Sequence, residues 1–134
     1  MNIETIVYGD LNIATVFRSK LEFSHDINFF TTNKDPLQIG YMKRPKKHNV
    51  KKHFHNSFKR EVFKTNEVII LKKGSFRIKF YTDENKFIKE IQINKDDILL
   101  IQNGAHELEM LSDCEFYEIK NGPYFSNKDK THLK

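Results

Sequence analysis

The sequence is poor in cysteine, proline and tryptophan, with one, three and none of these residues among 134. The single cysteine, Cys114, excludes a disulfide within the chain, which is typical of a reducing compartment, and we expect it to be a small buried apolar residue. No apolar run approaches the ~20 residues that cross a bilayer. The residues after Met1 have neither the basic nor the apolar segment of a signal peptide. We therefore expect a cytoplasmic protein that does not insert into a membrane.

The positive charge of the chain is unevenly distributed. The formal net charge is +5, and residues 43–52 contain six of the lysines and arginines. Such a segment can bind nucleic acid, so a basic nucleic-acid-binding β-barrel is one alternative function. Arginine is scarce, however, and no nucleic-acid-binding motif accompanies the segment. We therefore expect a solvated surface at residues 43–52 and no nucleic-acid partner.

The chain length fits a single domain that spans residues 1–134. Its 12 phenylalanines and 5 tyrosines can form a core without disulfides or a structural metal. A metal in this chain is therefore expected to serve function rather than folding.

Apolar and polar residues alternate along much of the chain, which predicts β-strands. The alternation is clearest at residues 75–81, and Gly74 before it can supply the positive φ of a tight hairpin turn. In a later strand we expect Phe87 to share one face with Ile91 and Ile93. Short strands with turn residues between them indicate an antiparallel sandwich or barrel. The predicted strands are residues 3–7, 13–17, 37–42, 51–55, 67–73, 75–81, 86–93, 98–101, 106–111 and 114–120.

Three histidines and one glutamate form a candidate metal site. His53 and His55 are separated by one residue, so on a strand their imidazoles point to the same face. Glu67 opens an otherwise apolar strand, where a buried carboxylate needs an ion or a strong partner, and Glu61 is a competing carboxylate. His106 follows a turn after another strand. Each of these four residue types, taken alone, is often an ordinary surface or core residue. Together, the three histidines and the glutamate are a nitrogen and oxygen ligand set for a divalent transition metal.

Two stretches of the chain resemble the two motifs of the cupin superfamily. The first motif is His-x-His, a later Glu, six residues and a Gly, and here it reads His53-Phe54-His55, Glu67 and Gly74. The second ends a strand with a Gly-containing turn and a His, and here it reads Asn103-Gly104-Ala105-His106. The chain departs from the family in having Lys47 where a Gly usually precedes the His pair and eleven residues between His55 and Glu67. The resemblance implies an all-β double-stranded β-helix, a jelly-roll barrel of antiparallel strands, with His53, His55, Glu67 and His106 holding one metal ion.

The resemblance also divides the single domain into three parts. Residues 48–124 correspond to the cupin core, residues 1–45 to N-terminal strands at the sheet edge, and residues 125–134 to a polar tail. Cupins of this size commonly dimerise, so we expect a homodimer in which the N-terminal strands extend the sheet of the partner.

A narrower group of small bacterial cupins shares further short motifs with this chain. These cupins are associated with surface-polysaccharide and sugar-nucleotide pathways, which implies a small polar ligand of the sugar or nucleotide-sugar class. The shared motifs are His53-Phe54-His55-Asn56, Thr65-Asn66-Glu67-Val68, His106 to Leu111, Gly122-Pro123-Tyr124 and Lys128 to Thr131.

A divalent ion bound in this way would polarise a carbonyl or hold two substrate oxygens, which suits an isomerase or epimerase. Such a reaction needs an acid/base residue near the ion, and the candidates by chemistry are Tyr81, Glu109, Glu118 and Tyr124. The ligands suit Fe, Mn, Ni, Co or Zn. Two alternatives stay open: an iron-dependent dioxygenase, and a non-catalytic cupin that binds a sugar or regulates a pathway. No organic cofactor is expected.

Overall fold

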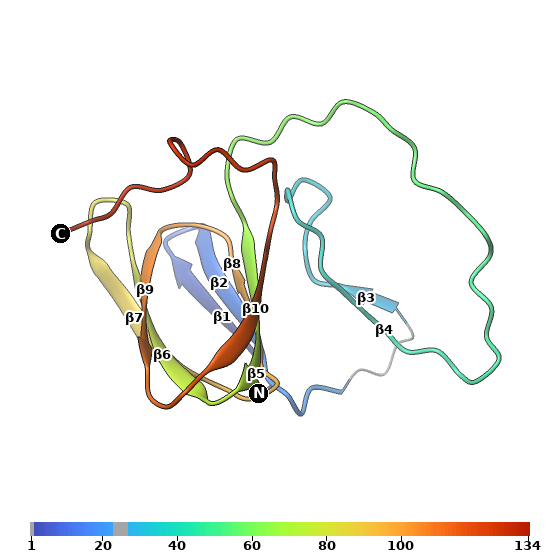
Figure 1. Cartoon of the computed structure of the whole chain (residues 1–134), viewed down its shortest axis with the longest axis horizontal. Helices are drawn as coiled ribbons and strands as arrows, with labels where there is room; N and C mark the ends of the chain where they lie inside the picture. The colour runs from blue at the N-terminus through green and yellow to red at the C-terminus, as the bar shows by residue number, and fades with distance from the viewer. Residues whose placement is uncertain (1, 23–26) are drawn as a thin grey trace. The chain divides into compact units, whose positions relative to one another are not determined.

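The computed structural model describes residues 2–22 and 27–134 and consists of antiparallel β-sheets (Figure 1). The chain divides into two compact units: unit 1 comprises Met1–Leu21 and Thr65–Lys134, and unit 2 comprises Glu22–Lys64. None of the described segments forms a helix that is long and apolar enough to cross a membrane. The strands are β1 (Ile3–Tyr8), β2 (Leu11–Phe17), β3 (Ile27–Phe29), β4 (Gly40–Met42), β5 (Glu67–Lys73), β6 (Ser75–Tyr81), β7 (Phe87–Asn94), β8 (Ile98–Ile101), β9 (Ala105–Met110) and β10 (Glu115–Lys120).

Unit 1 contains two sheets. The five-stranded sheet has the order β1-β2-β8-β5-β10, and the three-stranded sheet has the order β7-β6-β9. All neighbouring strands in both sheets are antiparallel. The all-β antiparallel class predicted from the sequence is therefore confirmed.

One hydrophobic core connects the two sheets. The alternating residues Phe76, Ile78 and Phe80 of β6 are fully buried and pack in one cluster with Ile69 and Leu71 of β5. Alternation on β6 thus places its apolar face on the core and its charged face on solvent, as the sequence predicts. The tight turn between β5 and β6 is also confirmed, because Gly74 adopts a φ of +84°.

Most predicted strands are present within a residue or two of the expected bounds, and there are two corrections. The strand predicted at residues 51–55 does not form, because no strand pairs with that backbone within the described chain. Phe87 does not face the core with Ile91 and Ile93. A bulge skips Ile88 in the pairing of β7 with β6, so Phe87 lies opposite Tyr81 and Ile88 packs against the core instead.

Ion pairing ties the N-terminal hairpin to the turn before β8. The Arg18 guanidinium donates to Asp97 Oδ2 at 2.8 Å and to Glu4 Oε2 at 2.6 Å. Asp97 is 2% exposed, and its carboxylate also accepts hydrogen bonds from the backbone N–H groups of Ser19 and Asn94, each at 2.9 Å. Three donors therefore converge on this one buried carboxylate.

Unit 2 contains one small hairpin and a long connecting segment. Strands β3 and β4 pair antiparallel, with Asn28 opposite Tyr41. Every residue from Tyr41 to Thr65 is solvent-exposed. The predicted N-terminal part, residues 1–45, thus spans both units, and its residues 1 and 23–26 lie outside the described chain.

Candidate functional site

A cavity of about 1130 Å³ lies in unit 1, at one end of its two sheets. It is found where β5 and β9 begin and where β6, β8 and β10 end. Its apolar lining comes from Ile69, Ile101, Leu108 and Phe116, and its polar lining comes from ionisable residues of the same strands and of the C-terminal tail. A partly apolar cavity with a few converging polar groups is a typical binding site for a small molecule.

Glu67 and His106 meet in this cavity. Their side chains are 15% and 28% exposed, and Glu67 Oε2 lies 4.0 Å from His106 Nε2. Glu67 is the first residue of β5 and His106 the second of β9, so the two belong to different sheets. The sequence assigned them to two separate motifs, and the fold brings them together.

Glu118 is the third ionisable group of the cluster. On β10 it pairs with Ile69 of β5, so it shares the inward face with Glu67 and Ile69. Burial raises the pKa of Glu67 to about 7, aided by a hydrogen bond with Glu118 and by its negative charge. Burial lowers the pKa of His106 from its ordinary value, although the charge of Glu118 opposes this. A carboxyl group with a pKa of about 7 can exchange protons near neutral pH.

Two lysines and the C-terminal tail complete the cavity, and the sequence analysis missed them. Lys120 pairs with Glu67 across β10 and β5, and its Nζ lies 3.3 Å from Asp129 Oδ2. Lys130 also lines the cavity, and its positive charge acts on the pKa of both Glu67 and His106. The tail passes across this end of unit 1 (Figure 1), where Asn85 Nδ2 donates to its last carbonyl at 2.9 Å. The spacing of Glu118 and Lys120, two apart on one strand, was the available sequence signal.

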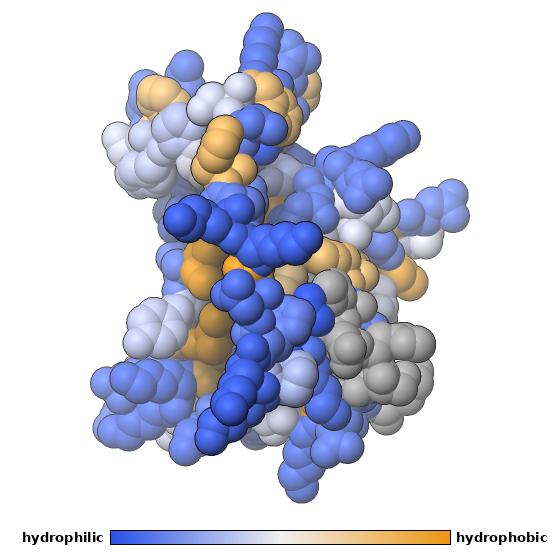
Figure 2. Space-filling view, turned by 90° about the vertical axis from the view of Figure 1, so that its right-hand side faces the viewer, coloured by the Kyte–Doolittle hydropathy of each residue, from blue (hydrophilic) through white to orange (hydrophobic). Residues whose placement is uncertain are grey.

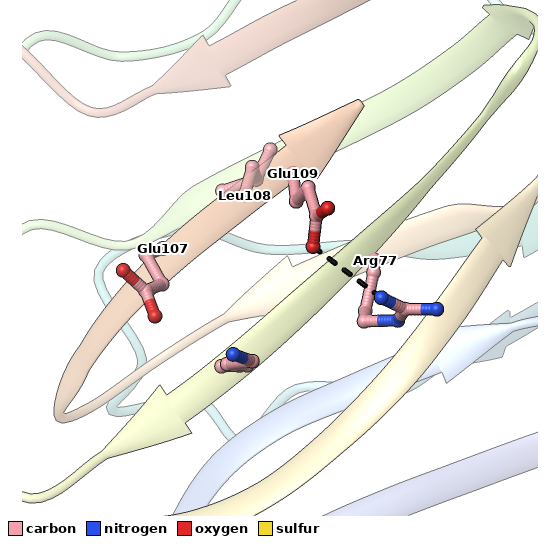
Figure 3. A pocket seen from close by; sticks show the side chains of 5 residues that line it. Arg77, Glu107, Leu108 and Glu109 are labelled. Carbon is pink, nitrogen blue, oxygen red and sulfur yellow. Dashed lines mark hydrogen bonds and ion pairs between the residues drawn. The ribbon is translucent and has the colours of Figure 1, made fainter. Parts of the chain in front are cut away.

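The other three acid/base candidates have different positions. Tyr81 lines the cavity and donates a 2.6 Å hydrogen bond to Glu107, which raises the pKa of the phenol. Glu109 lies in a separate pocket of about 240 Å³, where it pairs with Arg77 at 3.3 Å (Figure 3). Tyr124 is exposed, with Lys120 Nζ 5.3 Å from its ring centroid. Glu118 and Tyr81 thus line the cavity, whereas Glu109 and Tyr124 do not.

His53 and His55 belong to unit 2. Their ring centroids lie 5.4 Å apart, although the strand on which the one-residue spacing was expected to align the two imidazoles does not form. His53 Nδ1 also lies 2.7 Å from the carbonyl oxygen of Lys51. The convergence of this pair with Glu67 and His106, which belong to unit 1, stays a prediction.

The residues of unit 1 fit part of a metal site. Metal–ligand distances of about 2.0–2.2 Å would let one ion contact both Glu67 and His106 after a small shift of either side chain. Within residues 2–22 and 27–134, no three His, Cys, Asp or Glu side chains are arranged so that they could hold an ion. Glu61, the competing carboxylate, pairs with Lys59 at 3.4 Å on an exposed segment. Unit 1 therefore brings two potential ligands, Glu67 and His106, near one another.

In comparisons with known proteins, no family model, no curated protein and no solved structure matches this chain.

Proposed function

We propose that the protein is a metal-binding cupin that acts on a small polar molecule, of the sugar or nucleotide-sugar class, as an isomerase or epimerase. The observation that carries this proposal is the 4.0 Å approach of Glu67 to His106 inside a cavity. These two residues come from the two stretches that resemble the cupin motifs. In this proposal the two sheets of unit 1 are those of a double-stranded β-helix.

Glu67 and His106, with His53 and His55, would hold one divalent ion. When bound, the ion supplies Lewis-acid polarisation of a substrate carbonyl or hydroxyl oxygen. Glu118, which shares the cavity wall with Glu67, is the residue that takes a proton from a substrate carbon and returns it. Tyr81 holds its phenolic proton through its bond with Glu107 and orients polar substrate groups. The apolar wall of Ile69 and Phe116 excludes water from one side of the ligand.

Metal content tests the metal site. Protein purified without a tag is expected to contain close to one divalent transition metal ion per chain. Inductively coupled plasma mass spectrometry measures this content. The variants His53→Ala, His106→Ala and Glu67→Gln should each lose most of the bound metal, because a site that lacks one ligand binds the ion far more weakly. Glu109→Gln is the matched control, since Glu109 lies in the separate pocket, and it should keep its metal.

Two results would change the proposal. Unchanged metal in both His53→Ala and His106→Ala refutes the site. Loss of metal from both histidine variants but not from Glu67→Gln would indicate a metal centre formed by three histidines without the carboxylate.

Hydrogen exchange tests the reaction. Monosaccharides, sugar phosphates and nucleoside-diphosphate sugars with a carbonyl are incubated with the protein in D₂O and followed by NMR. An isomerase or epimerase exchanges the C–H proton next to the carbonyl for deuterium, and Glu118→Gln is expected to slow this at least 100-fold. If binding occurs without any exchange, the non-catalytic alternative replaces the enzymatic one.

A further inference from the structure

The segment that connects β4 to β5 carries most of the positive charge of the chain. Residues 43–64, which we call the basic arm, contain nine lysines and arginines and one acidic residue, which gives a formal charge of +8. Because the whole chain has a formal charge of +5, the remaining residues carry −3. Glu61, the acidic residue of the arm, is already paired with Lys59 at 3.4 Å. The arm is thus a cationic surface on a chain that is otherwise slightly acidic.

The basic arm is exposed along its whole length. Every residue from Tyr41 to Thr65 is solvent-exposed, and Figure 1 draws the segment after β4 as a long connection without strands. From residue 50 to residue 63, no backbone group hydrogen-bonds to the backbone of another described residue. The arm thus has the exposure that binding to a large partner requires.

Apolar side chains are interleaved with the charges of the arm. Four exposed apolar residues recur at every fourth position: Val50, Phe54, Phe58 and Val62. On an extended chain they share one face with the basic residues Lys52 and Arg60. The Arg60 guanidinium carbon lies 3.8 Å from the centroid of the Phe58 ring. Figure 2 shows one face of the molecule on which apolar residues lie exposed among hydrophilic ones. A contiguous exposed apolar group usually marks an interaction site, and here the same face of the arm also carries cations.

The charge of the arm requires an anionic partner, and its residue types favour a lipid surface over nucleic acid. Seven of its nine basic residues are lysines, whereas the planar guanidinium of arginine is the group suited to nucleic-acid recognition. Two of the four apolar residues are valines, which offer no ring on which a base could stack. Apolar side chains of both kinds enter the acyl boundary of a membrane, and lysines bind its anionic head groups.

The sequence alone indicated a solvated surface at residues 43–52. The exposed apolar face that follows these residues adds the second property of a membrane-binding segment, because charge attraction and apolar insertion together bind more strongly than either signal alone.

We propose that the basic arm binds the surface of an anionic membrane. Lys52 and Arg60 lie among the anionic head groups, and the rings of Phe54 and Phe58 enter the acyl boundary. The backbone stays at the level of the head groups, where water can hydrogen-bond with it, so this binding needs no membrane-spanning helix. The inference does not depend on the metal or the reaction, and the variants tested below keep all four of the proposed metal ligands.

Sedimentation of the full chain with sucrose-loaded vesicles tests the proposal. Vesicles of phosphatidylcholine with about one third phosphatidylglycerol should bind the protein at least ~100-fold more tightly than vesicles of phosphatidylcholine alone. Raising the salt from about 0.1 M to about 0.5 M should weaken this binding at least ~10-fold, because the Debye length shortens. The double variant Lys52→Glu and Arg60→Glu should weaken it at least ~20-fold through the lost charge. The double variant Phe54→Ser and Phe58→Ser should weaken it at least ~10-fold through the lost apolar burial.

Each double variant has a matched control in unit 1. The variant Lys89→Glu and Lys95→Glu changes the net charge by the same amount, and both lysines are exposed. The variant Val7→Ser and Phe87→Ser removes two apolar side chains that are 54% and 53% exposed. Both controls should bind the anionic vesicles as the wild type does, and circular dichroism verifies that every variant is folded.

Three results would overturn the proposal. The first is equal binding of the wild type to neutral and anionic vesicles, or no binding to either, which excludes a role for the anionic lipid. The second is unchanged binding of either arm variant, or an equal loss in its control, which means that the arm does not determine binding. The third is tighter binding of a labelled single-stranded oligonucleotide than of the anionic vesicles under the same conditions, which would assign the arm to nucleic acid instead.

Discussion

Glu67 Oε2 and His106 Nε2 lie 4.0 Å apart, yet the two side chains do not form a strong ion pair. Burial raises the pKa of Glu67 to about 7 and lowers that of His106, so both shifts favour the uncharged forms. At neutral pH the pair is therefore largely a neutral imidazole beside a carboxyl group that is half protonated. The neutral imidazole is the form that can ligate a metal ion, whereas the carboxyl would first have to lose a proton that its raised pKa retains.

The raised pKa of Glu67 predicts that the metal-free protein becomes less stable as pH rises. The unfolded carboxyl has its ordinary pKa of 4.5, and the folded one has a pKa of about 7, so the folded state binds the proton more tightly. This contribution to stability is complete below pH 4.5 and is lost as the pH rises through 7. Urea denaturation in EDTA at pH 5, 6, 7 and 8 measures this effect. The free energy of unfolding should fall by on the order of 1–3 kcal/mol over this range.

Glu67→Gln should remove this loss, because the amide does not ionise. Glu109→Gln, in the separate pocket on the other face of β9, should keep it. If the wild type and Glu67→Gln respond identically to pH, the carboxyl at position 67 is not desolvated in solution.

The sequence placed Glu67 and His106 in one candidate site, and the fold brings these two side chains to 4.0 Å, with some of the groups around them unforeseen. His106 follows the Gly104 turn by two residues, whereas Glu67 opens β5 at the end opposite Gly74. Lys120 and Lys130 were missed because lysines are ordinarily solvated, and only the return of the tail over the cavity brings Lys130 in. Glu118 was one of four equal candidates, since alternation along β10 alone does not say which face is inside.

Asp97 predicts a large loss of stability on substitution. Asp97→Ala removes the carboxylate that accepts hydrogen bonds from Arg18 and from two backbone N–H groups. These three donors then lack that acceptor. Loss of one partner of a buried, hydrogen-bonded charge pair typically costs 3–5 kcal/mol, and Arg18 is partly solvated, so we expect about 3 kcal/mol by urea denaturation.

Glu109→Ala is the control for this substitution. Its pair with Arg77 joins two largely exposed side chains, so the expected loss is below about 1 kcal/mol. Equal losses in the two variants would show that Asp97 does not act through its buried hydrogen bonds.

The strands of the second half were predicted well because local alternation and turn residues specify them. The pairing of β2 with β8 joins residues far apart in the sequence, and no local pattern encodes it. Phe87 was assigned to the wrong face because one bulged residue reverses the alternation beyond it. The strand expected at residues 51–55 has the right pattern, but a strand also needs a partner, and the described chain supplies none.

Two glycines with positive φ predict different costs for the same substitution. Gly9 has a φ of +60°, and a Cβ there would meet no atom within 4 Å, so Gly9→Ala costs only the backbone strain of about 1 kcal/mol. Gly74 has a φ of +84°, and a Cβ there would overlap the carbonyl oxygen of Asp113. Gly74→Ala should therefore cost 2 kcal/mol or more, since the strain and the overlap add. Urea denaturation of both variants measures the difference, and equal losses would mean that the β5–β6 turn moves away from Asp113 without cost.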